Sequence, residues 1–327
     1  MKKYKMASLF AGIGGIDLGF ENAGVDSIWA NEIDVNAAIT FSINHPKTKL
    51  VVEDIKNING KDIPKVDILA GGFPCQAFSV AGYRKGFKDD RGNLFFEIIR
   101  IIEEMANNKN KPKIVFLENV KNLYNHDGGR TYKVILKMLK DVLGYTVVTN
   151  IFNSCEYGNL PQNRERIYII SFLDKKIAEK FIWPTPIPLT NTIEKVIDWK
   201  STVDNKYYYT EDMKCYDLVK EGVTKQHTIY QYRRVYVRAN KSNICPTLTA
   251  NMGTGGHNVP LIIDNKKRIR KLTPRECLNL QGFPSKFIIP ENLTNTKIYK
   301  QAGNSVSVPV IQRIAEAVIG AMDNETN

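Results

Sequence analysis

Between Lys5 and Leu173 the chain alternates short apolar runs with segments of helical periodicity, and this alternation restricts the possible fold more than any other feature. Strands that alternate with helices are typical of a parallel α/β sheet. The last two runs are joined by a long segment without a helical pattern, which favours an antiparallel hairpin at the end of the sheet. The sequence therefore predicts an α/β domain with strands at Lys5–Phe10, Ser27–Asn31, Leu50–Glu53, Val66–Ala70, Lys113–Leu117, Tyr145–Phe152 and Arg166–Phe172.

The pattern changes at Pro184-Thr185-Pro186-Ile187-Pro188, a segment typical of a linker. Residues 185–275 then hold 16 Lys or Arg against 8 Asp or Glu, together with several tyrosines. A solvated small domain and a nucleic-acid-binding surface both fit this composition. An amphipathic helix through Ile311 and Val318 follows and is expected to return to the first domain. We therefore predict a first domain at 1–184, an inserted domain at 185–275, and a hinge with the returning helix at 276–327.

A glycine-rich segment, Phe10-Ala11-Gly12-Ile13-Gly14-Gly15, follows the first predicted strand and opens a helix. Glycines allow a ligand to approach the backbone closely, and the amino terminus of a helix favours anionic groups. Asp17 stands where a dinucleotide fingerprint requires glycine, so the match to that motif is imperfect. Glu32 ends the second strand, where a carboxylate can accept hydrogen bonds from ribose hydroxyls. A tight structural turn fits these residues about as well, but we predict a nucleoside-containing cofactor of open identity.

A cysteine follows the fourth strand, in Gly71-Gly72-Phe73-Pro74-Cys75-Gln76, at the edge where open α/β sheets bind ligands. A thiol in such a loop is suited to act as a nucleophile, although an inert side chain is equally compatible. Phe78 occupies the position of the second cysteine of a zinc deaminase, which argues against that class of enzyme. We predict no metal site, and we expect the other cysteines to be inert: Cys155, Cys215, Cys245 and Cys277.

Two further polar motifs lie near the ends of predicted strands. Glu118-Asn119-Val120 ends the fifth strand, at the same sheet edge as Cys75. Its carboxylate could be a capping or ion-paired group, or it could share a proton with a ring nitrogen inside a closed, dry pocket. Arg164 and Arg166 start the last strand and offer fixed donors to a carbonyl oxygen or a phosphate, unless they pair with Glu165 at the surface.

These motifs, in this order, resemble those of the DNA cytosine-5 methyltransferases, specifically the compact bacterial type, over the whole chain except the basic segment. Further matching strings are Arg270–Pro284 and Gln301–Val306, while Asn163, often basic in relatives, is a minor departure. The resemblance implies an S-adenosylmethionine-dependent methyltransferase with a Rossmann-like sheet and a small, mostly irregular or β target-recognition domain at 185–275. It implies S-adenosyl-L-methionine as the cofactor, bound by Phe10, Gly12, Gly14, Gly15, Glu32, Ile33, Asp54, Ile55, Pro74, Asn304 and Ser305.

The reaction implied by the resemblance is methylation of carbon 5 of a cytosine flipped out of duplex DNA. Cys75 would be the nucleophile at carbon 6, and Glu118, Arg164 and Arg166 would hold the base. Residues 79–93 would form a mobile loop that closes over it. The resemblance and the positive charges together predict DNA contacts from Gln76, Ser79, Arg91, Arg233, Arg234, Arg238, Thr249, Gly255 and Gly256.

Composition restricts the setting in which such an enzyme works. A net charge of +12 favours a polyanionic partner, either nucleic acid or an anionic membrane surface. No apolar run reaches the roughly 18 residues of a spanning helix, which argues against an integral membrane protein. The odd number of scattered cysteines favours a reducing compartment. We expect a cytoplasmic monomer that acts on double-stranded DNA as the modification enzyme of a restriction–modification system. A cognate restriction endonuclease would require no contact with it.

Three other functions share part of these features. A tRNA cytosine-5 methyltransferase has the same nucleophile and carboxylate motifs, but the basic segment ending in Thr247-Leu248-Thr249-Ala250 favours DNA. A non-catalytic DNA-binding relative would not need Cys75, Glu118 and Arg166 together, and a dehydrogenase would leave Cys75 and the basic segment unexplained. The stretch 233–257 resembles the recognition regions of enzymes that act on short palindromes beginning with CC.

Overall fold

The structure is a computed structural model that describes residues 4–74, 94–254 and 258–324. The chain forms two compact units. The first unit is Met1–Phe152, Glu165–Pro184 and Val310–Asn327, and the second is Asn153–Arg164 and Thr185–Pro309. The larger segment of the second unit starts at Thr185, in the predicted linker. The unit also holds Asn153–Arg164, which the sequence analysis places in the first domain, and 276–309, which it groups with the returning helix. The reason is local packing, because α10 (Pro274–Leu280) and α11 (Asn295–Asn304) contact each other and other parts of the second unit.

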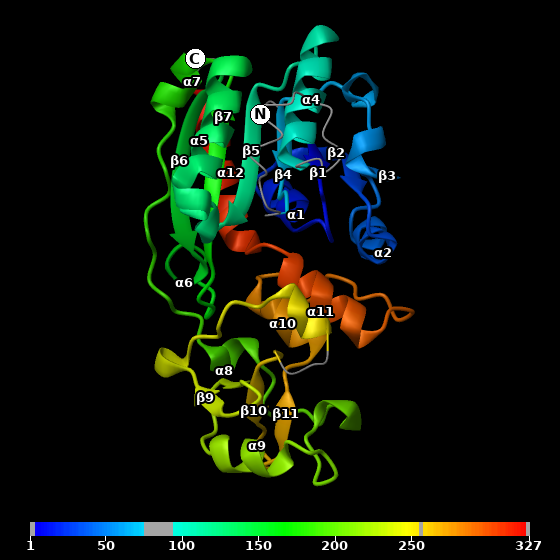
Figure 1. The fold of residues 1–327 in the computed structure, drawn as a ribbon, viewed down its shortest axis with the longest axis vertical. Helices are drawn as coiled ribbons and strands as arrows, with labels where there is room; N and C mark the ends of the chain where they lie inside the picture. The colour runs from blue at the N-terminus through cyan, green and yellow to red at the C-terminus, as the bar shows by residue number, and fades with distance from the viewer. Residues whose placement is uncertain (1–3, 75–93, 255–257, 325–327) are drawn as a thin grey trace. The chain divides into compact units, whose positions relative to one another are not determined.

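A seven-stranded sheet organises the first unit, in the order β3-β2-β1-β4-β5-β7-β6 (Figure 1). The strands from β3 to β5 pair in parallel, and β7 is antiparallel to β5. Every strand predicted from the alternation is present, and the predicted hairpin strands β6 and β7 are neighbours. Because the order reverses at β1, the carboxyl ends of β1, β2 and β4 form the ligand edge of the sheet. The strands are β1 (Lys5–Leu9), β2 (Asp26–Glu32), β3 (Lys49–Val52), β4 (Ile68–Gly71), β5 (Ile114–Val120), β6 (Thr146–Asn153) and β7 (Glu165–Phe172).

Helices cover both faces of this sheet, because successive strand residues point to opposite sides. Val115 of β5 belongs to a core cluster with Ile98 of α4 (Leu94–Asn107) and residues of α5 (Arg130–Lys137). The next residue of β5, Phe116, instead contacts Phe20 of α1 (Gly15–Asn22), with ring centroids 5.2 Å apart. Further helices are α2 (Val35–Asn44), α7 (Lys175–Lys180) and α12 (Val308–Asp323), which belongs to the first unit from Val310 onward.

The second unit is built around a small four-stranded antiparallel sheet in the order β11-β10-β8-β9. Its strands are β8 (Tyr230–Tyr232), β9 (Val237–Ala239), β10 (Leu261–Ile263) and β11 (Ile269–Lys271). Its other helices are α6 (Ser154–Tyr157), α8 (Ile193–Val196) and α9 (Tyr216–Gly222). Much of the remaining backbone is irregular, as expected for a small, mostly irregular or β domain. Buried Arg270 pairs with Glu276 of α10 at 2.8 Å and links β11 to that helix.

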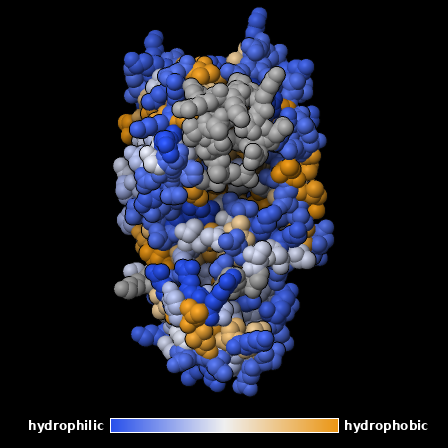
Figure 2. Space-filling view, viewed as in Figure 1, coloured by the Kyte–Doolittle hydropathy of each residue, from blue (hydrophilic) through white to orange (hydrophobic). Residues whose placement is uncertain are grey.

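Among the described residues, one helical stretch, Asn295–Asp323, is long and apolar enough on average to cross a membrane. This differs from the expectation that no run reaches such a length. Of its most apolar window, 61% is buried, and α11 ends at Asn304 before α12 begins at Val308. Burial in the protein core accounts for this composition. The face of the molecule drawn in Figure 2 is mostly hydrophilic, with separate small hydrophobic patches.

Candidate active site

The glycine-rich segment begins where β1 ends, at the reversal of the strand order. Phe10 and Gly12 have positive φ angles of 53° and 58°, and Gly14, at the N-cap of α1, has a φ of 83°. The Ala11 N–H donates to the Asn31 carbonyl oxygen at 2.9 Å, which holds the loop against β2. A Cβ atom at Gly12 would meet no atom of the described residues within 4 Å. The loop therefore offers bare backbone to a ligand.

Glu32, at the end of β2, fixes this loop and is 8% exposed. One of its carboxylate oxygens accepts the Gly12 N–H at 2.7 Å, and the other accepts the Asp34 N–H at 2.7 Å. Each oxygen keeps a second lone pair, so Glu32 can still accept hydrogen bonds from the hydroxyls of a ribose. Ile33, the next residue, is 60% exposed and offers an apolar surface to the flat face of a purine.

The end of β3 is held next to Glu32 by the buried side-chain amide of Asn31, a residue that the sequence analysis does not single out. Asn31 donates to the carbonyl oxygens of Val51 at 3.1 Å and Glu53 at 2.8 Å, which brings Asp54 close to Glu32. The signal for Asn31 was a polar residue inside an apolar strand, directly before Glu32. The side chain of Ile55, predicted to contact the cofactor, packs in the core at 3% exposure, so only its backbone can reach a ligand.

The end of β4 leads into the segment that carries Cys75. The Asn119 side chain donates to the Phe73 carbonyl oxygen at 2.8 Å, so the chain two residues before Cys75 is tied to the residue after Glu118. Asn119 is also absent from the predicted site. Its position directly after Glu118 was the feature of the sequence that could have identified it. Pro74 is exposed. The predicted site residues Cys75, Gln76, Ser79 and Arg91, and the predicted loop 79–93, lie outside the described residues.

The paired strands β5 and β7 place Glu118 and Arg166 side by side. The Arg166 Nε atom lies 3.1 Å from the Glu118 Oε1 atom, and the two side chains are only 13% and 10% exposed. Arg166 also donates to its neighbour's carbonyl at 2.8 Å, which leaves guanidinium donors for a ligand. The surface alternative does not hold for Arg166, because the Glu165 carboxylate pairs with Lys121 at 2.7 Å. A buried carboxylate and guanidinium therefore meet one strand away from the Cys75 segment.

Arg164 has a different place, in the second unit, where it is 2% exposed. Its guanidinium donates to the carbonyl oxygens of Leu248 at 2.9 Å, Gly303 at 3.3 Å and Ser305. These contacts tie two distant segments of the chain together. They give Arg164 a structural role and offer no support for the predicted contact with cytosine. Of the two predicted cofactor residues here, Ser305 is buried and Asn304 is exposed.

The predicted DNA-binding residues of the second unit are exposed where they are described. Arg233 and Arg234 lie in the turn between β8 and β9, and Arg238 lies in β9. The turn is closed by the Arg233 N–H, which donates to the Tyr236 carbonyl oxygen at 2.9 Å. Thr249 is also exposed. Gly255 and Gly256 lie outside the described residues.

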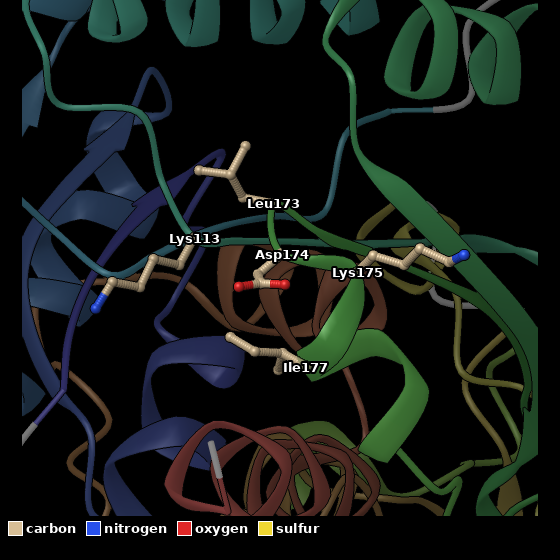
Figure 3. A pocket seen from close by; sticks show the side chains of 5 residues that line it. All are labelled: Lys113, Leu173, Asp174, Lys175 and Ile177. Carbon is tan, nitrogen blue, oxygen red and sulfur yellow. The ribbon is translucent and has the colours of Figure 1, made fainter. Parts of the chain in front are cut away.

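A cavity of about 420 Å³ lies at the opposite end of the β5–β7 pair from Glu118 and Arg166. Its lining is Lys113, Leu173, Asp174, Lys175 and Ile177, and Figure 3 shows the Lys113 and Lys175 side chains extending away from the Asp174 carboxylate on opposite sides. This cavity is not part of the candidate active site.

The described part of the chain offers few groups that could bind a metal ion or act as a reactive thiol. No group of three or more His, Cys, Asp or Glu residues there could hold a metal ion. The four described cysteines are free thiols. Burial raises the pKa of Cys245 and Cys277 above the usual thiol value, which keeps both thiols protonated and unreactive.

Comparison with known proteins identifies the family. The family model of the C-5 cytosine-specific DNA methylases matches residues 4–320. The chain is 56% identical to the type II methyltransferase M.Bsp6I of Bacillus sp. (strain RFL6), over 97% of this chain and 99% of that protein. It is 44% identical to the type II methyltransferase M1.ScrFI of Lactococcus lactis subsp. cremoris, over 98% of this chain and 79% of that protein.

Solved structures support the same fold. The crystal structure of the S. pombe Dnmt2 methyltransferase superposes with a TM-score of 0.75 at 19% identity, covering 98% of this chain and 100% of that one. A likeness at this identity concerns the fold alone, whereas the family model spans nearly the whole sequence. The chain therefore belongs to the C-5 cytosine-specific DNA methylases, and it is an enzyme that methylates carbon 5 of cytosine in DNA.

Proposed function

We propose that this methyltransferase uses S-adenosylmethionine to methylate a cytosine flipped out of a short duplex DNA site, as the modification enzyme of a restriction–modification system. The observation that carries the proposal is the buried Glu118–Arg166 pair, 3.1 Å apart, beside the strand end that leads to Cys75. The type II names of the relatives M.Bsp6I and M1.ScrFI support the role in restriction–modification.

The residues around the glycine loop fit the proposed cofactor. Gly12 faces open space among the described residues, Glu32 has free lone pairs, and Ile33 exposes an apolar side chain next to that carboxylate. These are the features that an adenosyl group requires: backbone for close approach, an acceptor for ribose hydroxyls and an apolar contact for adenine. When bound, S-adenosylmethionine supplies an electrophilic methyl group.

At the cytosine, each proposed catalytic residue meets a chemical need of the reaction. Carbon 5 is a weak nucleophile, so the Cys75 thiolate adds to carbon 6 and moves electron density to carbon 5. Glu118 would share a proton with the ring nitrogen and accept a hydrogen bond from the amino group, and Arg166 would donate to the carbonyl oxygen. Carbon 5 would take the methyl group from S-adenosylmethionine as the sulfur–methyl bond breaks, leaving S-adenosylhomocysteine, and the carbon 5 proton would pass to water. The Cys75–carbon 6 bond then breaks, which restores the aromatic ring and frees the thiolate.

The DNA must present the target base outside the helix, because carbon 5 and carbon 6 are not accessible to a thiol inside a duplex. The exposed Arg233, Arg234, Arg238 and Thr249 support a role of residues 185–275 in recognising the site. We further propose that the enzyme acts as a cytoplasmic monomer and that a cognate endonuclease cuts the same site without contacting it.

Bisulfite sequencing of DNA from bacteria that express the protein, in a host without other cytosine methylation, tests this function. Protected cytosines should occur at one position of one short sequence and on both strands of a palindrome. Cells that express a Cys75→Ala variant provide the matched control, with no protection expected. Protection scattered over many unrelated sequences, or none from a folded wild-type protein, would contradict the proposal, and methylated RNA with unmethylated DNA would favour a tRNA substrate.

A further inference from the structure

A buried histidine lies directly under the glycine loop and has no part in the chemistry described above. His45 follows α2, is 3% exposed, and stacks on Phe41 with ring centroids 4.6 Å apart. A Cβ atom built on Gly14 would lie 2.1 Å from its Nε2 atom. The imidazole therefore occupies the space that a side chain at residue 14 would need, and it touches the residue that turns the loop into α1.

The ionisable groups that face His45 come from α1. Its Nδ1 atom lies 3.2 Å from the Glu21 carboxylate, whose side chain is 34% exposed. Asp17 is fully buried, and its Oδ1 atom accepts hydrogen bonds from the hydroxyls of Ser8 at 2.8 Å and Ser27 at 2.7 Å. Among the described residues, the groups that the sheet contributes here are these hydroxyls. Within the part of the chain that is described, the Asp17 Oδ2 atom has no hydrogen-bond partner.

This environment stabilises the imidazolium form. Burial favours neutral imidazole, but the Glu21 and Asp17 carboxylates and the Gly14 backbone outweigh it, so the pKa of His45 is raised from its usual value. Burial also raises the pKa of Asp17, although His45 and the Ser8 and Ser27 hydroxyls oppose this shift.

Protonation changes what His45 presents to the loop. A neutral imidazole has one N–H, which the Glu21 carboxylate would hold at Nδ1, and it would turn a lone pair at Nε2 toward the Gly14 backbone. The Gly14 carbonyl oxygen is itself an acceptor and already receives the Leu18 N–H at 2.8 Å. An imidazolium instead presents an N–H there. The protonated ring therefore favours the left-handed conformation of Gly14, with its φ of 83°.

We propose that His45 is a positioning residue for the cofactor loop, and that its protonated form holds Gly14 in the conformation that binds the adenosyl ligand. The inference rests on the proposed function, because it takes S-adenosylmethionine as the ligand of this loop. It extends that function by linking cofactor affinity to the protonation of a residue that does not touch the cofactor.

Titration calorimetry with S-adenosylhomocysteine between pH 5.5 and 8.5 tests the proposal on the full chain. In the wild type the affinity should fall by roughly tenfold, or about 1.4 kcal/mol, as the pH rises through the titration of His45. His45→Gln should bind weakly with no such step, and Glu21→Gln should move the step to lower pH, because a charge that supports the imidazolium is lost. His227→Gln, the same replacement in the second unit, should behave as the wild type.

The possible outcomes distinguish a failure of the His45 inference from a failure of the proposed cofactor. No binding to the wild type at any pH would contradict S-adenosylmethionine, whereas equal pH profiles in all four proteins would overturn the role of His45 alone. If His45→Gln fails to fold, the pKa of His45 in the wild type can be measured instead, by NMR titration with and without the ligand. By linkage, ligand binding must then raise the pKa of His45, and an unchanged pKa would overturn the proposal.

Discussion

In the proposed function Glu118 and Arg166 recognise cytosine, and their charges and their burial complement one another. Removing either partner of a buried ion pair would leave the other charge uncompensated, so the 3.1 Å contact keeps both side chains ordered before the base arrives. A carboxylate that accepts from an amino group distinguishes cytosine from thymine, which has a carbonyl at that position. The pair thus prepares a site for one base.

In the proposed mechanism, bond making depends on Cys75. Replacing Cys75 with Ala should reduce methyl transfer by at least about 10³-fold, because no other group supplies the nucleophile. Binding of cofactor and DNA should remain largely intact. Transfer of a labelled methyl group to DNA, together with gel-shift binding, measures both properties, and near-normal turnover by Cys75→Ala would refute the covalent mechanism.

In the proposed function, recognition of the cofactor ribose depends on Glu32. Glu32→Ala should weaken S-adenosylhomocysteine binding by roughly 10- to 100-fold, because two hydrogen bonds of about 1 kcal/mol each are lost together with the anchor of Gly12. Glu179→Ala, in exposed α7, removes the same group far from the loop and should have no effect. Tight NADH binding without a response to the sulfonium ligand would point to a different cofactor.

Sequence reasoning located the residues at strand ends and failed for residues whose partners are remote in the chain. Glu32 and Glu118 follow from the alternation of strands, since a parallel sheet collects its carboxyl ends at one edge. Arg166 lies at the same edge because it is at the start of β7, which is antiparallel to β5. Arg164 lies two residues before Arg166, but its acceptors are up to 141 residues away. No periodicity or spacing reveals such a contact, so the structural role of Arg164 emerges only from the fold.

At the scale of elements, a close backbone approach joins α11 to the Thr-Leu-Thr segment. A Cβ atom at Gly303 would lie 2.1 Å from the Thr249 carbonyl carbon, which is main chain and cannot rotate away. Gly303→Ala should therefore destabilise the second unit by about 3 kcal/mol or more. Gly320→Ala in α12 is the control, because its added methyl meets no described atom within 4 Å and alanine favours helix. Thermal unfolding compares the two, and equal melting temperatures would show that the approach is looser than described.

The stability of the turn after β10, which contains Asp264 and Arg268, should depend on pH. Burial of Asp264 opposes ionisation, but hydrogen bonds from the Arg268 backbone and side chain outweigh it and lower the pKa of the carboxyl. A lowered pKa gives stability that is present above about pH 4, the usual value for Asp, and is lost as the pH falls through the folded value. Asp264→Asn should thus speed amide exchange at Lys266 and Arg268 at pH 7, and the difference should shrink in acid.

Asp204→Asn is the matched control for this turn. Asp204 also accepts a backbone N–H two residues on, at 3.1 Å from Lys206, but its side chain is 57% exposed. Its replacement should change exchange only slightly at any pH. Equal effects of the two substitutions would mean that burial and the Arg268 contacts add nothing to the Asp264 turn.

The elements of the first unit were predictable and the boundaries of the second were not. Each predicted strand has an apolar run, and the central strands β1, β4 and β5 are buried as a parallel sheet requires, so local sequence and global fold agree. The short strands β8 to β11 have three residues each, too few for a period to be seen. The extent of the second unit depends on packing of α10 and α11, which no linker or composition change marks.

At the scale of the whole molecule, positive charge is concentrated in one part of the sequence. Residues 185–275 have eight more Lys and Arg than Asp and Glu, out of a net charge of +12 for the chain. Contacts of these side chains with phosphates release counterions and bind any DNA, with an affinity that falls steeply as salt rises. Choice among sequences needs base-edge contacts in addition, which arginine donors can make to guanine.

Exchange of the recognition segment tests this division of labour. If 185–275 recognises the site and the first unit performs the chemistry, a chimera that carries this segment from a relative of different specificity should methylate the relative's site. The exposed Arg233, Arg234 and Arg238 should dominate the choice: charge reversal at a base-contacting arginine would relax the site, whereas loss of a phosphate contact would weaken all sequences alike. Bisulfite sequencing identifies the methylated site in each case. A folded and active chimera that keeps the original site would place recognition elsewhere in the chain.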